Sequence, residues 1–318
     1  MTAYIVRRLA QALLVLFIVS LLVFLVMHLL PGDPILIYLS EQDVENLTPE
    51  QIAYYRHQFG LDKPLPVQYV NWIADLLHGD FGISVNYHED VGKLLAERLP
   101  VTIHLGLLAL LLASIFGILT GVLAALRRGK WLDTVMTLLA NIGITIPVFW
   151  LGILMIYGIG LELRWLPICG YTSPFEDFWL STKQVIMPVL CLAVFALAST
   201  ARQTRSSMLE VIRQDYIRTA WAKGLREQTI VTRHALKNAL IPVVTLIGMH
   251  VRRVFGGSVF IETVFNIPGV GRLMVSSVLG HDYAVVQSGV LVIAAIVVLT
   301  NLIVDISYGW LDPRIRYG

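Results

Sequence analysis

The chain has 318 residues, of which 56% are hydrophobic and 14% are charged, and its formal net charge at pH 7 is +2. Soluble domains carry about 25% charged residues, so this composition indicates that most side chains face a lipid bilayer rather than water. The small net charge, without any block of like charges, argues against a nucleic-acid partner. Cys169 and Cys191 fall in different segments, which argues against a disulfide framework or a metal site.

Six apolar segments reach or approach the roughly 20 residues that a transmembrane helix needs. The first is too long for a signal peptide and ends in Leu-Leu-Pro-Gly at residues 29–32 rather than in a cleavage site, so we expect a retained anchor. We predict an all-α membrane protein with six transmembrane helices. In chain order the segments are Leu9–Leu30, Val101–Leu126, Thr134–Leu163, Gln184–Ala201, Ala239–Phe255 and Ala284–Trp310.

The charges between these segments predict the orientation of the chain. Residues 31–100 hold four Lys/Arg against eleven Asp/Glu, whereas the insert Arg202–Asn238 holds eight Lys/Arg and the loop 127–130 is basic. Because short basic loops remain on the cytoplasmic side of a membrane, we expect both termini and the insert to be cytoplasmic.

The long acidic loop shows helical patterns. Thr48-Pro49 followed by Gln51 is typical of a helix start, and the apolar residues of Val67–Leu77 recur at helical spacing. We predict a helical extracytoplasmic loop, the alternative being a solvated loop packed on the bundle. The predicted domains are residues 1–100, an N-terminal transmembrane helix with this loop, and residues 101–318, a five-helix core that contains the cytoplasmic loop 202–238.

Pro147 interrupts the third apolar segment, which also contains four glycines between residues 143 and 160. Small residues allow helices to pack closely in a membrane, and a broken helix can also line a cavity. Both interpretations of this segment stay open.

The basic insert has its own helical pattern. Leu209, Ile212, Tyr216 and Ala220 recur at helical spacing, and Gly224 ends the pattern. We expect two short helices that meet at Gly224 in a compact knob, where small side chains let a partner approach the backbone. The alternative is a solvated basic loop.

Arg218-Thr219-Ala220, Gly224 and Leu240-Ile241-Pro242 stand in the order of a known pattern. The stretch resembles the "EAA" loop of permease subunits in binding-protein-dependent ABC importers, which is Glu-Ala-Ala, three residues and Gly, with a Pro downstream. Arg218 and Thr219 depart from the pattern, so a Glu contact to the ATPase is not transferred to Arg218.

Further short motifs occur in order along nearly the whole chain. They are Tyr4–Leu9, Pro31–Pro34, Gly60–Asp62, Gly79–Ser84, Pro268–Arg272 and Asp312–Arg316. Together they resemble the dipeptide/oligopeptide/nickel branch of these permeases. The resemblance implies a type I ABC importer permease fold in a prokaryotic inner membrane. It also implies three kinds of partner: a second, homologous permease in a heterodimer, two ATPase subunits that bind ATP and magnesium, and an extracytoplasmic solute-binding protein.

The resemblance implies an importer of di- or oligopeptides, with no cofactor in this chain. Nickel, metal chelates and glutathione-like solutes are alternatives for the same machinery, and an ion-gradient-driven secondary transporter is an alternative of another class. The expected ATPase-docking residues are Asp215, Arg218, Thr219, Ala220, Lys223, Gly224 and Leu225.

A second polar group, His250, Arg252 and Arg253, lies within the fifth apolar segment, near mid-membrane or just beyond. Charges at such a depth face the bundle interior or water. We predict that these residues, with Pro147, line a translocation path that attracts carboxylate groups. The alternatives are that the arginines extend to the outer surface or pair with Glu262, and that His250 is a packed polar residue rather than a metal ligand.

The sequence contains no phosphate-binding Gly-x-x-x-x-Gly-Lys-Ser/Thr motif, no His-Glu-x-x-His and no nucleophile elbow. We therefore expect no catalytic residues and no enzyme. A secondary transporter is disfavoured because Glu162 and Asp305 lie near the ends of their segments.

Overall fold

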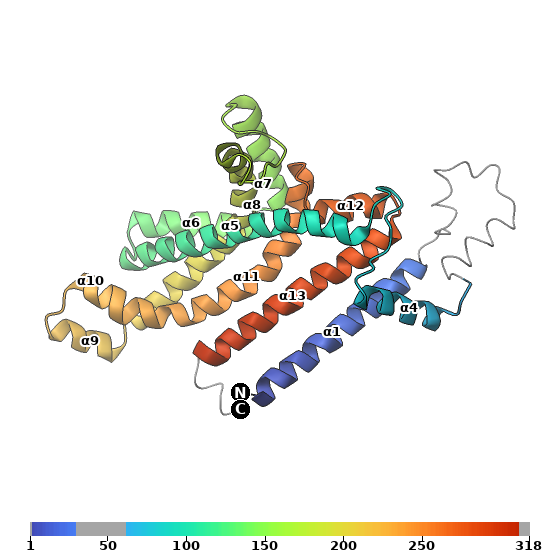
Figure 1. Cartoon of the computed structure of the whole chain (residues 1–318). Coiled ribbons are helices and arrows are strands. Elements are labelled where there is room, and N and C mark those ends of the chain that lie inside the picture. The colour runs from blue at the N-terminus through green and yellow to red at the C-terminus, as the bar shows by residue number, and fades with distance from the viewer. Residues whose placement is uncertain (1, 30–61, 312–318) are drawn as a thin grey trace. The chain divides into compact units, whose positions relative to one another are not determined.

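The computed structural model describes residues 2–29 and 62–311, and these residues form helices without a strand. The all-α prediction is therefore confirmed (Figure 1). The predicted helix after Thr48 lies outside the described residues. The helices are α1 (Thr2–Leu29), α4 (Leu65–Leu77), α5 (Val91–Leu126), α6 (Trp131–Thr145), α7 (Val148–Met155), η2 (Ile156–Glu162), α8 (Phe178–Val211), α9 (Asp215–Ala222), α10 (Glu227–Thr229), η3 (Ile230–Ala235), α11 (Leu236–Val264), α12 (Val270–Leu279) and α13 (Tyr283–Leu311).

Five helical stretches of the described chain are long and apolar enough to cross a membrane, and a bent pair makes up to six. The pair consists of Trp131–Thr145 and Val148–Glu162, which meet at 107°. The prediction of a six-helix membrane protein agrees with this count. The five stretches are Ile5–Leu29, Val91–Leu126, Phe178–Val211, Glu227–Val254 and Tyr283–Leu302.

Packing divides the chain into two compact units. One contains residues 1–100 and 273–318, and the other contains residues 101–272. In the first unit α1 and α13 lie side by side and antiparallel, so that α1 begins where α13 ends (Figure 1). The domain boundary at residue 100 that we expect from the sequence stays a prediction.

The first unit contains α4, which confirms the amphipathic helix expected at Val67–Leu77. Tyr69 of α4 packs on α1, and its hydroxyl is hydrogen-bonded to the Ser20 hydroxyl at 2.8 Å. The hairpin that follows is held to the start of α13 by Asp282, whose carboxyl accepts hydrogen bonds from the Ser84 hydroxyl and the Asn86 backbone N–H.

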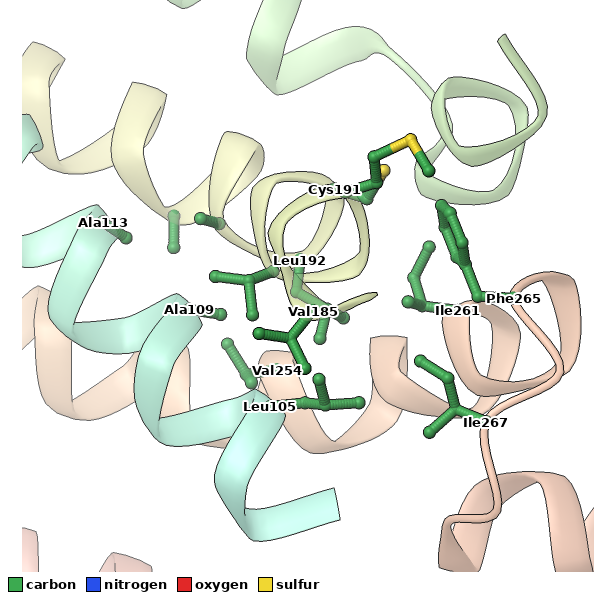
Figure 2. Packing of buried hydrophobic residues seen from close by; sticks show 14 of the residues in the cluster. Leu105, Ala109, Ala113, Val185, Cys191, Leu192, Val254, Ile261, Phe265 and Ile267 are labelled. Atoms are coloured by element: carbon green, nitrogen blue, oxygen red, sulfur yellow. The ribbon is translucent and has the colours of Figure 1, made fainter. Parts of the chain in front are cut away.

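The second unit has an apolar core in which α8 packs against α11, α6 and α7 (Figure 2). Small residues at the contacts bring the helices close together: Ala109 and Ala113 of α5, and Cys191 of α8, are buried in this core. In a bilayer, where lipid is as apolar as leucine, close packing of this kind is what holds helices together.

The third apolar segment is broken at Pro147, which precedes the first residue of α7. Three of its glycines have close neighbours: a Cβ at Gly143 would touch Ala198, one at Gly152 would touch Phe265, and one at Gly160 would overlap Ile168. Close packing is therefore found at these three positions. Gly158 faces open space, so packing explains only part of the glycine pattern.

The C-terminal end of α11 carries a buried carboxyl group, that of Glu262, which is fully shielded from solvent. It accepts hydrogen bonds from the Thr102 hydroxyl at 2.8 Å and from the Arg272 backbone N–H at 3.0 Å. A Cβ at Gly269 or Gly271 would overlap this carboxyl group, which gives the Pro-Gly-Val-Gly motif a physical reason. We call this arrangement the Glu262 clasp.

Candidate functional site: the knob between α8 and α11

Residues 212–235, which we call the knob, connect α8 to α11 at the same end of the second unit as the turn between α5 and α6 (Figure 1). The single helix expected through Leu209–Ala220 is wrong. The chain leaves α8 after Val211, turns at residues 212–214 and begins α9 at Asp215. The turn allows the apolar residues of α9 to fold back onto the bundle instead of extending into water.

The inner face of α9 consists of Ile217 and Ala220, which are 0% and 6% exposed. They share an apolar cluster with Met208 of α8, Ile230 of η3 and Ala239 of α11. The small side chain of Ala220, expected to face a partner, thus lies in the core of the knob. The knob is a folded element with its own buried cluster rather than a solvated loop.

The outer face of α9 lies opposite this cluster. Residues at helical spacings of three, four and seven share one face, and Asp215, Arg218, Thr219 and Ala222 are all exposed. Arg218 approaches Asp215 at 3.4 Å, but both side chains are largely in solvent, so the pair contributes little to stability. The outer face is therefore exposed and available to a partner.

Gly224 forms the turn that ends α9. Its φ is +74°, in the left-handed region that side-chain-bearing residues rarely adopt. Its N–H donates to the Trp221 carbonyl at 2.9 Å, and the Leu225 N–H donates to the Ala220 carbonyl at 3.4 Å. These two bonds are the Schellman end of a helix. Nothing lies within 4 Å of a Cβ built on Gly224, so the space beside it is open.

Two exposed aromatic residues of the knob were not among the docking residues predicted from the sequence. Trp221 is 48% exposed beside the Gly224 turn, and Tyr216 is 43% exposed with its hydroxyl 2.8 Å from the Asn238 amide nitrogen. Lys223 and Leu225 complete the exposed rim. An aromatic side chain in a short polar insert is the signal that could have found Trp221, because apolar residues left in water often mark a contact surface.

The second candidate site, the path, is a cleft of about 790 Å³. His250, Arg252 and Arg253 of α11 all line it, together with Ile146 and Val148, the neighbours of Pro147. The structure thus brings α11 and the break at Pro147 to one cleft. Pairing of the arginines with Glu262 is not observed: the oxygens of Glu262 accept from Thr102 and Arg272, and the Arg253 guanidinium lies over the Phe195 ring.

Among the described residues, no group of three or more His, Cys, Asp or Glu side chains is placed to hold a metal ion. A further polar contact in the second unit is the ion pair between Asp133 at the start of α6 and Arg205 of α8. The Arg205 guanidinium donates two hydrogen bonds, at 2.6 and 2.8 Å, to the Asp133 carboxylate. This pair joins the α5–α6 turn to the helix that leads into the knob.

Known proteins match this chain over nearly its whole length. The family model of the binding-protein-dependent transport system inner membrane component matches residues 117–317, and the model of the N-terminal part of such components matches residues 1–106. A probable peptide ABC transporter permease protein of Sinorhizobium fredii is 42% identical over 317 residues, covering 100% of both chains. The di/tripeptide transport system permease protein DppB of Pseudomonas aeruginosa is 38% identical over 337 residues, covering 100% of this chain and 99% of that protein.

A solved structure shares the fold. An inward-facing form of the MetNI methionine ABC transporter matches with a TM-score of 0.56 and 20% identity, over 69% of this chain and 97% of that chain. The predicted type I importer permease fold is confirmed by this likeness together with the family match. The protein is a multi-pass membrane subunit that serves transport and not catalysis. The chain belongs to the family of binding-protein-dependent transport system inner membrane components.

Proposed function

We propose that this chain is a permease subunit of an ATP-driven importer of di- and oligopeptides. The observation that carries the proposal is the full-length similarity to permeases that are named for peptide and di/tripeptide transport. The comparisons give no support to nickel, metal-chelate or glutathione-like solutes, nor to an ion-gradient-driven transporter.

The knob is the docking surface for the ATPase in this proposal. Its outer face is exposed, and the small side chains of Thr219 and Ala222 allow a groove on a partner to approach the α9 backbone there. Its inner face is packed on α8 and α11, so that a displacement of α9 is transmitted to two long helices rather than absorbed by a flexible loop. ATP and magnesium belong to the partner subunits.

The family implies an ATPase and a substrate-binding partner. We extend this to a full assembly of two homologous permeases, two ATPase subunits and one extracytoplasmic solute-binding protein. The solute-binding protein delivers the peptide from outside. ATP binding and hydrolysis in the ATPase subunits, transmitted through the knobs, switch the path between outward-facing and inward-facing forms.

The decisive test replaces Gly224 by Leu. The change strains a left-handed backbone and fills open space beside the outer face of α9, so we expect the purified permease to lose most of its ability to capture the ATPase subunits. ATP-dependent peptide uptake in vesicles falls with it. Pull-down of the ATPase and uptake are measured on the same preparations.

The matched control is Gly129→Leu. Gly129 also has a φ of +74° and open space around it, but it lies in the α5–α6 turn outside the knob. The backbone strain is therefore the same, and only the place differs. Normal ATPase capture by the Gly224 variant, or equal loss in both variants, would contradict docking at the knob.

We also propose that both termini and the knob are cytoplasmic. The antiparallel α1 and α13 support termini on one side, and the basic knob sequence supports the cytoplasm. Cys169, the exposed native cysteine in the segment between η2 and α8, is then extracytoplasmic and should react with a membrane-impermeant maleimide in intact cells. In a Cys169→Ala background, Glu227→Cys should react only after the membrane is opened; the reverse pattern would invert the topology.

A further inference from the structure

The cleft on the second unit is strongly biased in charge. It is bounded by the chain on either side of Pro147, by α8 and by α11, and its volume of about 790 Å³ lies in the range of about 300–1,000 Å³ typical of small-molecule sites. Two arginines and one histidine line it, and none of the described residues that line it is Asp or Glu. The cleft thus presents positive charge that its own walls do not neutralise.

His250 contributes a buried hydrogen-bonding atom that the protein leaves unused. Its side chain is 4% exposed, and its Nε2 has no hydrogen-bond partner. A buried polar atom without a partner is unfavourable, so binding of a ligand group that hydrogen-bonds to it is favoured. Phe195 packs edge-to-face on the imidazole at 6.0 Å between ring centroids, which holds the ring in place.

Phe195 also orients Arg253. The guanidinium carbon of Arg253 lies 3.8 Å from the centroid of the Phe195 ring. Stacking uses the flat face of the guanidinium and leaves the N–H groups of its edge available, in the fork geometry that matches a carboxylate. Arg252 is exposed beside it on the same helix. Arg252 and Arg253 lie near the end of the apolar stretch Glu227–Val254, where a counter-charge stabilises charged groups.

We propose that this cleft binds the carboxylate of the transported peptide, with Arg252 and Arg253 as its hydrogen-bond donors and His250 as a neighbouring polar contact. The inference rests on the proposed function, because it names the part of the solute that the path recognises. A terminal carboxylate is common to all peptides, whatever their side chains. The largely apolar remainder of the wall, including Leu246, Met249 and Phe260, accommodates side chains without selecting among them.

The test uses the full transporter, reconstituted in vesicles with a saturating amount of loaded solute-binding protein. Uptake of an alanine peptide is compared with uptake of the same peptide as its C-terminal amide, at concentrations that fill the solute-binding protein with either. Because delivery is then equal, the remaining difference reports a step within the permease. We expect the wild type to import the free acid faster than the amide.

In the Arg252→Gln, Arg253→Gln double variant, the ratio of acid uptake to amide uptake should fall about tenfold. This is the change expected from the loss of one hydrogen bond to a charged group. The acid rate falls to that of the amide, while the yield of the assembled complex stays unchanged. Arg164→Gln, at an exposed arginine outside the cleft, removes the same charge and should keep the preference. If the double variant fails to assemble, Arg252→Gln alone decides, because Arg252 does not stack on Phe195.

An acid-to-amide ratio that is the same in variant and wild type would overturn the carboxylate site while peptide import itself stands. A wild-type transporter that imports neither peptide would instead overturn the proposed function, and the site with it. If Arg253→Lys keeps half or more of the wild-type acid-to-amide preference, a positive charge alone is sufficient. The planar guanidinium stacked on Phe195 is then not the group that recognises the carboxylate.

Discussion

The two ends of α11 differ in how they treat polar groups. At the C-terminal end, the carboxyl group of the Glu262 clasp is fully buried and accepts hydrogen bonds from within the chain. At the other end, the knob buries an apolar cluster and leaves the polar residues of α9 in solvent. The comparison shows that the polar groups at one end of the helix are satisfied by hydrogen bonds within the chain. At the other end the polar residues of α9 remain in solvent, where a partner can contact them.

The largest effect is expected at the clasp. Glu262→Ala removes the acceptor of the Arg272 N–H and of the Thr102 hydroxyl and leaves a cavity between them, which should cost about 2–4 kcal/mol. The midpoint of thermal unfolding of the purified permease measures it. Glu262→Gln keeps the volume and one acceptor, so its loss should be smaller. A midpoint unchanged by the Ala variant would show that the clasp does not stabilise the second unit.

A smaller effect is expected on the inner face of the knob. Ala220→Leu inserts three carbon atoms into the cluster of Ile217 and Ile230, and overpacking of this kind costs about 1–3 kcal/mol. Limited proteolysis of the knob is the sensitive measurement, because local loosening precedes global unfolding. Cleavage at the wild-type rate would mean that the buried cluster accommodates the larger leucine side chain without loosening.

The smallest effect on stability, and a large one on binding, is expected on the outer face. Ala222→Leu makes the same chemical change two residues further on, at an exposed position, so stability should stay within about 0.5 kcal/mol. Capture of the ATPase subunits should nevertheless weaken. Equal behaviour of the Ala220 and Ala222 variants in both assays would remove the distinction between an inner and an outer face.

The number and type of the membrane helices could be predicted because long apolar runs have few other solutions in a chain of this composition. The break at Pro147 was also visible in the sequence. Its angle of 107° was not, because the angle depends on how Gly143 meets α8 and how Gly152 meets Phe265. Contacts between segments so far apart in the sequence leave no local pattern.

The knob shows the same limit at shorter range. Gly224 was predicted to form its turn because glycine marks left-handed backbone. The turn at residues 212–214 was missed because neither Gly nor Pro stands there and the apolar spacing remains helical on both sides. In the cleft, the charges of α11 were predicted, whereas Phe195, which orients Arg253 from another helix, was not.

The ion pair at the start of α6 has a consequence for how the protein is made. Asp133 and Arg205 are 72 positions apart, and a ribosome that adds about 5–20 residues per second needs about 4–14 s to cover that distance. Through this interval the Asp133 carboxylate has been synthesised and its guanidinium partner has not. The start of α6 therefore lacks this ion pair until α8 has been synthesised, so the final packing of α6 on α8 can form only after the fourth crossing has been made.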